Sequence, residues 1–419
     1  MRPPPMRILL LTAYYPPELG APQTRLRETA RRLLARGHRV RVVTGPPHYP
    51  DGVVRPGYPA WRPTRERIDG LPVVRLPMLA RPNGGLRDRL IDQGSFAAAA
   101  LAALPEVRWS DVVVVESPPL ALGASATWLG LAGRRPYLFH VADPWPDFPI
   151  AMGALQSPLL QRAAYAVEDL AYRRAALVTT VTPGLVELLG AKPGAAGKVR
   201  LLPNGVDTRR FEPRLAPAEA RRRLGWPETT LTLVYAGSVG QAQGLATLLE
   251  AMTPLAGRDI ALHVVGQGIE RERLAADARR RGLDAVRFEP SVPADRVPTV
   301  LAAADAILVL LRRGPLYEQA LPTKLVEGLA AGRPLIVSAD GEAAAIVRSS
   351  RPAAGLTSPA EDAAALREAI VELAGRSPRS RAAMGRAARA VAESAYDREA
   401  IVERLEGYLA SIREPRRSR

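Results

Sequence analysis

Residues 7–22 read RILLLTAYYPPELGAP, and this stretch decides the fold. Arg7–Thr12 is a short apolar run, which is typical of a strand in a parallel sheet covered on both faces. A turn-rich loop follows, and then a helix whose apolar residues between 26 and 34 share one face. Gly37 ends that helix, and Arg39–Thr44 forms the next strand. The stretch therefore predicts a βαβ unit.

The same alternation continues to residue 205 and then starts again. Pro203-Asn204-Gly205 indicates a turn that closes the first half. Leu231–Ala236 is the first strand of the second half, followed by a glycine loop and the helix Leu245–Met252. Alternating strands and helices predict the α/β class. The further strands expected are Val112–Glu116, Pro136–Val141, Leu177–Val181, Ala261–Val265, Ala285–Phe288, Ala306–Leu311 and Leu335–Val337.

We therefore expect two Rossmann-like, doubly wound parallel-sheet domains. They should span residues 1–205 and 206–395, and residues 396–419 should form a helix returning toward the first domain plus a basic tail. Right-handed crossovers place the strand-to-helix loops at the carboxyl edge of each sheet. Two such edges facing each other predict a central cleft that holds the chemistry.

Composition excludes several classes of site. The chain has 419 residues, which suits two domains, and it has no cysteine for disulfides or thiolate metal sites. The four histidines lack metal-ligand spacing, and there is no Asp-x-Asp pattern to hold a divalent ion on a diphosphate. We therefore expect no metal and no other cofactor.

The formal net charge of +16 favours anionic partners. Aromatic residues make up only 5%, and no basic stretch is interleaved with them, so nucleic acid is not an expected partner. Arg25–Arg36 and Arg81–Arg89 carry arginines beside apolar residues, which predicts either a solvated face or contact with anionic lipid headgroups. No signal peptide or membrane-spanning stretch is evident, so we expect a cytoplasmic protein that can touch the inner face of the membrane.

In each half, a glycine-containing loop follows the first strand. Gly20 lets the backbone approach a ligand, and the next helix presents N–H groups to an anion, although an ordinary proline-rich turn is the alternative. In the second half, Tyr235–Gly244 contains three glycines between a strand and a helix. Such a loop can hold a diphosphate on its backbone amides. Its candidate residues are Gly237, Ser238, Gln243 and Gly244.

The segment Leu321-Pro322-Thr323-Lys324 carries the strongest signal. Thr323 is predicted to cap a helix, with Lys324 in its first turn. A cation is disfavoured at a helix N-terminus, and a bound diphosphate would make that charge favourable. Glu327 lies one turn further, and its carboxylate, directed toward the same end, can accept hydrogen bonds from a ribose. The alternative is a solvated helix.

His140 and Asp143 follow a strand of the first half and are candidate catalytic residues. Asp143-Pro144-Trp145-Pro146 is a stiff turn that would direct side chains into the cleft. His140 can hydrogen-bond a sugar or accept a proton from an acceptor, or it can simply be satisfied by the backbone. His38 and His263 are interpreted as structural.

From Met6 to the last helix, the chain resembles a family 4 retaining glycosyltransferase of the GT-B fold. Within that family it is similar to the bacterial branch of fucosyl and N-acetylfucosamine transferases of surface polysaccharide assembly. The set of motifs in this order carries the resemblance. The motifs are Tyr14-Tyr15-Pro16-Pro17, Ser117-Pro118-Pro119, Asp143-Pro144-Trp145-Pro146, Pro203-Asn204-Gly205-Val206-Asp207, Ala242-Gln243-Gly244-Leu245 and Leu321-Pro322-Thr323-Lys324.

The resemblance implies transfer of a sugar from a UDP- or GDP-sugar to a glycan or lipid-linked acceptor, in cell-surface polysaccharide biosynthesis. It implies that Glu327 binds the ribose, that Lys324 binds phosphate, and that the backbone near Val292 faces the base. No metal is needed, because amides and cations stabilise the departing diphosphate. Leu321 and Thr323 complete the expected donor site, together with the loops at Gly20 and Gly237.

The chain departs from the family pattern at three places. The family has two glutamates eight positions apart, and here that position holds Gln319, with Glu318 displaced by one as the candidate catalytic carboxylate. Gln241 and Gln243 replace the usual arginine and lysine, which leaves Lys324 more of the charge. Ala142 stands where many members have a histidine.

Two other functions stay open. A GT-B-type epimerase or hydrolase would act on the sugar-nucleotide without an acceptor, and it would need a fuller set of carboxylates. A non-catalytic nucleotide-sugar-binding module is supported by Gln241, Gln243 and Gln319.

Overall fold

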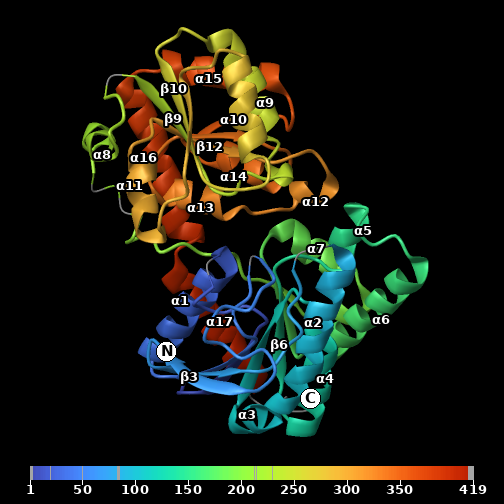
Figure 1. Cartoon of the computed structure of the whole chain (residues 1–419). Helices are drawn as coiled ribbons and strands as arrows, with labels where there is room; N and C mark the ends of the chain where they lie inside the picture. Colours follow the sequence, from blue (N-terminus) through green and yellow to red (C-terminus); the bar gives the residue numbers. More distant parts are fainter. Residues whose placement is uncertain are drawn as a thin grey trace. The chain divides into compact units, whose positions relative to one another are not determined.

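The structure is a computed structural model that describes residues 3–18, 20–49, 51–82, 85–211, 213, 215–228 and 230–413. It divides into two compact units, formed by the described residues of Met1–Pro203 with Glu399–Arg419, and of Asn204–Arg398. Each unit is an α/β structure built on a largely parallel sheet (Figure 1), so the predicted fold class is confirmed. The predicted basic tail beyond Arg413 lies outside the described residues.

The first unit contains a sheet with the strand order β3-β4-β2-β1-β5-β6-β7-β8. Neighbouring strands are parallel, except that β3 pairs antiparallel with β4. This edge hairpin was not predicted, although Asp69-Gly70 at its turn, with both φ values positive, is a recognised hairpin signal. The strands are β1 (Arg7–Leu11), β2 (Arg39–Thr44), β3 (Thr64–Ile68), β4 (Leu71–Arg75), β5 (Val112–Ser117), β6 (Tyr137–Val141), β7 (Leu177–Thr180) and β8 (Val199–Leu201).

The second unit contains a fully parallel sheet with the order β11-β10-β9-β12-β13-β14. The direction of winding reverses between β9 and β12, which is where ligands of such sheets bind, outside the carboxyl ends of the strands. The strands are β9 (Leu231–Ala236), β10 (Ile260–Val265), β11 (Val286–Glu289), β12 (Ala306–Leu310), β13 (Leu335–Ser338) and β14 (Gly355–Ser358).

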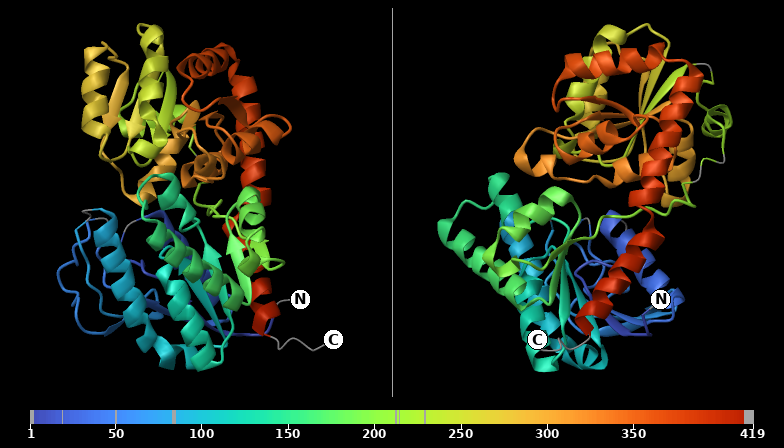
Figure 2. Two further views of the ribbon diagram at one scale, coloured as in Figure 1. Left: turned by 90° about the vertical axis from the view of Figure 1, so that its right-hand side faces the viewer. Right: turned by 180° about the vertical axis from the view of Figure 1, so that it is seen from behind.

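Helices cover both faces of each sheet (Figure 2). Those of the first unit are α1 (Ala21–Ala35), α2 (Leu86–Ala100), α3 (Leu104–Trp109), α4 (Ala121–Gly133), α5 (Asp147–Ala151), α6 (Pro158–Arg174) and α7 (Pro183–Gly190). Those of the second unit are α8 (Pro217–Leu224), α9 (Leu245–Met252), α10 (Arg271–Arg280), α11 (Val297–Ala302), α12 (Pro315–Glu318), α13 (Thr323–Ala330), α14 (Glu342–Ser349), α15 (Ala363–Gly375) and α16 (Pro378–Ala395).

The continuous apolar run of β1 is explained by burial on both sides. Ile8 and Leu10 belong to one hydrophobic cluster, whereas Leu9 and Leu11 belong to the cluster on the opposite face. Because successive side chains of a strand point to opposite faces, a strand covered on both sides needs apolar residues at every position. Strand β9 follows the same rule, since Leu233 and Val234 lie in different clusters.

The last helix, α17 (Arg398–Arg413), packs on the first unit beside α1. Its apolar residues Ile401, Leu405 and Leu409 join the cluster that contains Ile8. Arg36, the C-cap residue of α1, also donates hydrogen bonds to Glu399, at 2.8 Å, and to Glu406, at 2.7 Å. Both ends of the described chain therefore belong to one unit.

None of the helices among the described residues combines the length and the apolar character that crossing a bilayer requires.

Candidate functional site

The glycine loop after β9 rests on the loop after β10. The Gly237 N–H donates to the Val265 carbonyl at 3.0 Å, and the Val239 N–H donates to the Gln267 carbonyl at 2.8 Å. A Cβ atom on Gly266 would lie 1.9 Å from the Gly237 carbonyl oxygen. The two backbones are therefore in direct contact, which only glycine permits at this position. Sequence reasoning missed Gly266, although the Gly-Gln-Gly run directly after a strand was a visible signal.

Helix α13 begins one residue differently from the sequence prediction. We expected Thr323 to be its N-cap, but the N-cap is Pro322, with extended backbone, and no side chain caps the helix. Thr323 already has helical geometry, so its hydroxyl is not in the capping position. The prediction for Thr323 was therefore wrong in this respect, whereas Lys324 still lies in the first turn.

The Lys324 side chain extends to the glycine loop. Its Nζ donates a hydrogen bond to the Tyr235 hydroxyl and lies 4.1 Å from the centre of the Tyr235 ring. A Cβ atom on Gly237 would lie 3.2 Å from Nζ, so the ammonium sits against the loop backbone. Loss of hydrating water lowers the pKa of Lys324 to about 7, although the Glu327 carboxylate opposes this shift. Gly237, Lys324 and Glu327 thus come together at the carboxyl edge of the sheet.

The other residues predicted to bind the donor lie in the glycine loop or in the hydrophobic core. Gln243 uses its side-chain oxygen to accept the Gly240 N–H at 3.2 Å, so it closes the loop on itself. Gly244 is the N-cap of α9 at φ 58°, which favours glycine. The carbonyl of Ser238 accepts the Tyr235 hydroxyl at 2.5 Å. Leu321 is buried in the core, and the half-buried Val292 packs against the same hydrophobic cluster.

Glu318, the candidate catalytic carboxylate, is exposed at the end of α12. Its backbone lies against the loop after β13, because a Cβ atom on Gly341 would be 2.1 Å from the Glu318 carbonyl oxygen. This close approach requires glycine, and Gly341 also has a positive φ of 67°. The position of α12 is therefore fixed by a neighbouring loop of the same unit.

In the first unit, His140 is buried on β6 and lies beside Glu116 of β5. Its Nδ1 is 2.9 Å from the Thr179 hydroxyl, and its Nε2 is 3.9 Å from Glu116 Oε1. Within the described ranges, Nε2 has no hydrogen-bond partner. Burial and the nearby Arg25 guanidinium hold the pKa of His140 well below its usual value. The imidazole is therefore neutral, and its buried Nε2 is left unsatisfied by the residues described.

Glu116 and Arg25 form a buried ion pair that sequence reasoning missed. Arg25 of α1 donates to Glu116 Oε1, and Glu116 Oε2 has no hydrogen-bond partner in the described part of the chain. Burial raises the pKa of Glu116, although Arg25 opposes the shift. Asp143 is exposed and interacts electrostatically with both Glu116 and Arg25. The only signal in the sequence was a glutamate at the end of a valine run.

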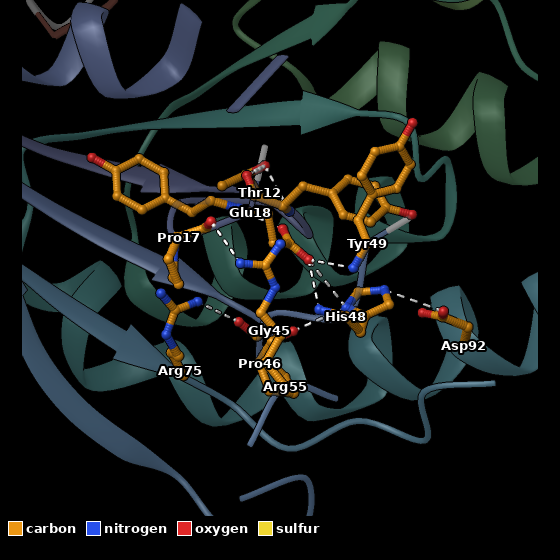
Figure 3. Close-up of polar contacts among 12 residues, drawn as sticks. Thr12, Pro17, Glu18, Gly45, Pro46, His48, Tyr49, Arg55, Arg75 and Asp92 are labelled. Carbon is orange, nitrogen blue, oxygen red and sulfur yellow. Dashed lines mark hydrogen bonds and ion pairs between the residues drawn. The ribbon is translucent and has the colours of Figure 1, made fainter. Parts of the chain in front are cut away.

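Gly20 is the N-cap of α1, and its carbonyl accepts the Thr24 N–H at 3.0 Å. Its φ of 168° is extended backbone, so this conformation does not require glycine. Two residues earlier, the buried Glu18 carboxylate accepts three backbone N–H groups, from Tyr15 at 3.2 Å, His48 at 2.7 Å and Tyr49 at 2.8 Å (Figure 3). The loops after β1 and β2 are therefore joined by one side chain.

His48 extends this connection to α2. Its Nδ1 lies 2.9 Å from the Pro46 carbonyl and its Nε2 lies 3.2 Å from Asp92 (Figure 3). Burial lowers the pKa of His48, but the hydrogen bond and the negative charge of Asp92 outweigh that and raise it overall. Both neighbours are acceptors, so the imidazolium fits this position best.

Among the described residues, no three histidine or carboxylate side chains gather as ligands for a metal ion.

Comparison with known proteins identifies the family. Residues 20–205 match the family described as glycosyl transferase 4-like domain, and residues 218–391 match glycosyl transferases group 1. The chain is also 31% identical to the provisionally named colanic acid biosynthesis glycosyl transferase WcaI of Escherichia coli, over 80% of this chain and 84% of that protein. The chain belongs to the family 4 glycosyltransferases. This glycosyltransferase is also 28% identical to a GDP-mannose-dependent mannosyltransferase of Mycobacterium tuberculosis, over 88% of this chain and 89% of that protein.

Solved structures show that this glycosyltransferase has the GT-B fold. Sucrose-phosphate synthase from Thermosynechococcus elongatus superposes with a TM-score of 0.75 at 21% identity, covering 96% of this chain and 98% of that one. Anabaena HepE in complex with UDP gives a TM-score of 0.71 at 18% identity, covering 97% and 100%. WaaG, a glycosyltransferase of lipopolysaccharide biosynthesis, gives 0.70 at 20% identity, covering 96% and 99%.

Proposed function

We propose that this glycosyltransferase moves a sugar, with retention of anomeric configuration, from a UDP- or GDP-sugar to a glycan or lipid-linked acceptor of cell-surface polysaccharide biosynthesis. The observation that carries the proposal is the Lys324 ammonium beside the glycine loop at the switch point of the second sheet. A cation beside a glycine loop suits a diphosphate. The related E. coli protein is named for colanic acid biosynthesis, and Anabaena HepE was solved with UDP and with UDP-glucose.

The chemistry follows from where charge develops. The bond between the anomeric carbon and the diphosphate oxygen breaks, the acceptor oxygen bonds to that carbon on the same face, and the acceptor proton passes to the released phosphate oxygen. Lys324 and the loop amides stabilise the negative charge that develops on the diphosphate. We assign His140, which is neutral and has its Nε2 unpaired among the residues that the structure describes, to a hydrogen bond with the acceptor hydroxyl rather than to removal of its proton. We assign Glu327 to the ribose and Glu318 to the donor sugar.

Within this class we propose fucose or N-acetylfucosamine as the transferred sugar, on the motif set from Tyr14-Tyr15-Pro16-Pro17 to Leu321-Pro322-Thr323-Lys324. A thermal-shift screen of nucleotide-sugars tests the donor, because a ligand that binds only the folded protein raises its melting temperature. If neither the nucleotide-activated fucose nor the nucleotide-activated N-acetylfucosamine raised the melting temperature, this assignment would be rejected.

Turnover measured with and without an acceptor separates transfer from the alternatives. We expect release of nucleoside diphosphate to depend on the acceptor, and to persist in excess EDTA, because the cationic and amide groups replace a metal. Acceptor-independent hydrolysis or epimerisation would favour an enzyme acting on the sugar-nucleotide alone, and tight binding without turnover would favour a binding module. Loss of activity in EDTA, restored by Mg²⁺ or Mn²⁺, would contradict the metal-free mechanism.

We also propose that the protein contacts the inner face of an anionic membrane through its first unit. In the structure, arginines of α1 pair with carboxylates, as in Arg27 with Asp69 and Arg25 with Glu116. The segment after β4 differs, because Leu79 is 61% exposed next to the exposed Arg81. The adjoining segment carries Trp61, which is 78% exposed. Apolar side chains surrounded by arginines suit anionic lipid.

Hydrogen bonds connect these two segments to each other and to the loop after β1. The Met78 N–H donates to the Ala60 carbonyl at 2.9 Å, and Arg55 donates to the Pro17 carbonyl at 3.1 Å. We expect the Trp61→Ala, Leu79→Ala double variant to bind vesicles of equal phosphatidylglycerol and phosphatidylcholine about tenfold more weakly, measured by co-sedimentation, because it removes the apolar contact. Trp128→Ala on α4, which removes an exposed tryptophan elsewhere, is the control. Equal binding by all three proteins would reject this surface.

A further inference from the structure

Tyr235 of β9 connects the two parts of the donor site, and neither the motifs nor the comparisons assign it a role. Its ring is fully buried, and its hydroxyl lies between the glycine loop and helix α13. On one side the hydroxyl oxygen is 2.5 Å from the Ser238 carbonyl oxygen, and on the other it meets the Lys324 ammonium. Tyr235 therefore contacts both elements expected to bind phosphate.

The direction of these two hydrogen bonds follows from the groups involved. A carbonyl oxygen can only accept, so the single hydroxyl proton of Tyr235 goes to Ser238. The lone pairs of the hydroxyl then face Lys324, which must act as the donor. Burial raises the pKa of Tyr235, so the hydroxyl keeps its proton. The two hydrogen bonds therefore run in one direction: Lys324 donates to Tyr235, and Tyr235 donates to Ser238.

The Tyr235 ring adds a second constraint on the same ammonium. Lys324 Nζ lies 4.1 Å from the ring centre, within the range in which a cation is attracted to an aromatic face. A lysine side chain has many rotamers, and holding it requires such contacts. Gly237 bounds the remaining space, since a Cβ atom there would lie 3.1 Å from Lys324 Cε. The ammonium is therefore held at the loop before any ligand arrives.

We infer that Tyr235 is a positioning residue for diphosphate binding: its hydroxyl and ring hold the Lys324 ammonium at the glycine loop, so that the lysine is already in place for the diphosphate of the donor. This inference rests on the proposed function. Groups fixed in their binding geometry in advance bind more tightly, because less conformational entropy is lost on binding. Tyr235 itself does not need to touch the ligand.

Tyr235→Phe tests the hydroxyl while keeping the ring. With UDP or GDP, whichever the wild type binds more tightly, we expect the dissociation constant measured by calorimetry to rise about tenfold, the effect of one net hydrogen bond to a charged group. Binding of the matching nucleoside, uridine or guanosine, should not change, because it has no phosphate. A general collapse of the site would weaken both ligands equally and would overturn the inference.

Two controls make the outcome specific. Tyr137→Phe removes another buried tyrosine hydroxyl, which donates to the Ala171 carbonyl at 2.7 Å in the first unit, and it should leave nucleotide binding unchanged. In a double-mutant cycle, Tyr235→Phe should cost nothing further when Lys324 is already Met. Additive losses, or wild-type affinity in Tyr235→Phe, would refute the inference. If the wild type binds no nucleoside diphosphate at all, the proposed function fails instead.

Discussion

Lys324→Met is expected to reduce kcat/KM for the sugar-nucleotide by about 100-fold, since removing one preorganised charge-stabilising donor costs roughly that much in other active sites. The methionine keeps the length and the apolar stem but has no charge. Gln241 and Gln243 of the loop are uncharged, and Arg312, whose side chain lies against Gly244, is paired with Glu361. The lysine is therefore expected to supply most of the positive charge on the diphosphate.

The pH dependence of binding gives an independent measurement. The pKa of Lys324 is lowered to about 7 in the protein without ligand, so the ammonium is progressively lost as pH rises through that value. A diphosphate favours the charged form, so binding above pH 7 should take up a proton and weaken with rising pH. A sugar-nucleotide has no group of its own titrating there. Calorimetry between pH 6 and 8 should show this slope in the wild type and none in Lys324→Met.

Lys198→Met is the matched control for both measurements. Lys198 lies in the first unit, where it donates to the carbonyls of Arg173 at 2.8 Å and Ala175 at 3.0 Å. Its replacement should change neither turnover nor the pH slope. If Lys324→Met retained wild-type turnover and the same slope, the assignment of this lysine to the diphosphate would have to be abandoned.

Gly266→Ala is expected to weaken nucleotide binding at least tenfold, even though residue 266 need not touch the ligand. The new methyl group would lie 1.9 Å from the Gly237 carbonyl oxygen, and this neighbour is backbone, so the glycine loop must shift. Overpacking of this kind destabilises proteins by about 1–3 kcal/mol. We therefore expect a lower melting temperature together with the loss of UDP or GDP affinity.

Gly282→Ala is the control that separates the effect of the steric clash at residue 266 from the effect of backbone strain. Gly282 also has a positive φ, 66°, but an added Cβ atom there would have no neighbour within 4 Å. It should lower the melting temperature through strain alone and leave the nucleotide dissociation constant unchanged. Equal affinities in Gly266→Ala, Gly282→Ala and the wild type would show that the loop contact does not set donor binding.

The parts of the fold that could be predicted are those with strong local patterns. The apolar runs of β1, β2 and β9 fixed their strands closely, and Leu245–Met252 was predicted as a helix with its exact bounds. The hairpin β3–β4 was missed, because its first strand is largely polar and lies at the sheet edge, where burial imposes no apolar pattern.

The site was less predictable, because much of it depends on contacts between residues far apart in the sequence. Arg25 pairs with Glu116, which is 91 positions away, and Tyr235 meets Lys324 across 89 positions. Nothing local in either segment indicates its partner, since topology alone brings them together. Lys324 itself could be proposed from the sequence, because a cation in the first turn of a helix is disfavoured by the helix dipole unless an anion binds there.

The packing of α17 on the first unit has a consequence for synthesis on the ribosome. Some of the apolar side chains that cover Ile8 and Leu10 come from residues 401–409, which are synthesised after Asn204–Arg398. Until these residues are made, the first unit keeps part of its apolar surface uncovered. The first unit can therefore be completed only after the second unit has been synthesised, and a chain that ends before residue 401 would expose apolar surface and be prone to aggregate.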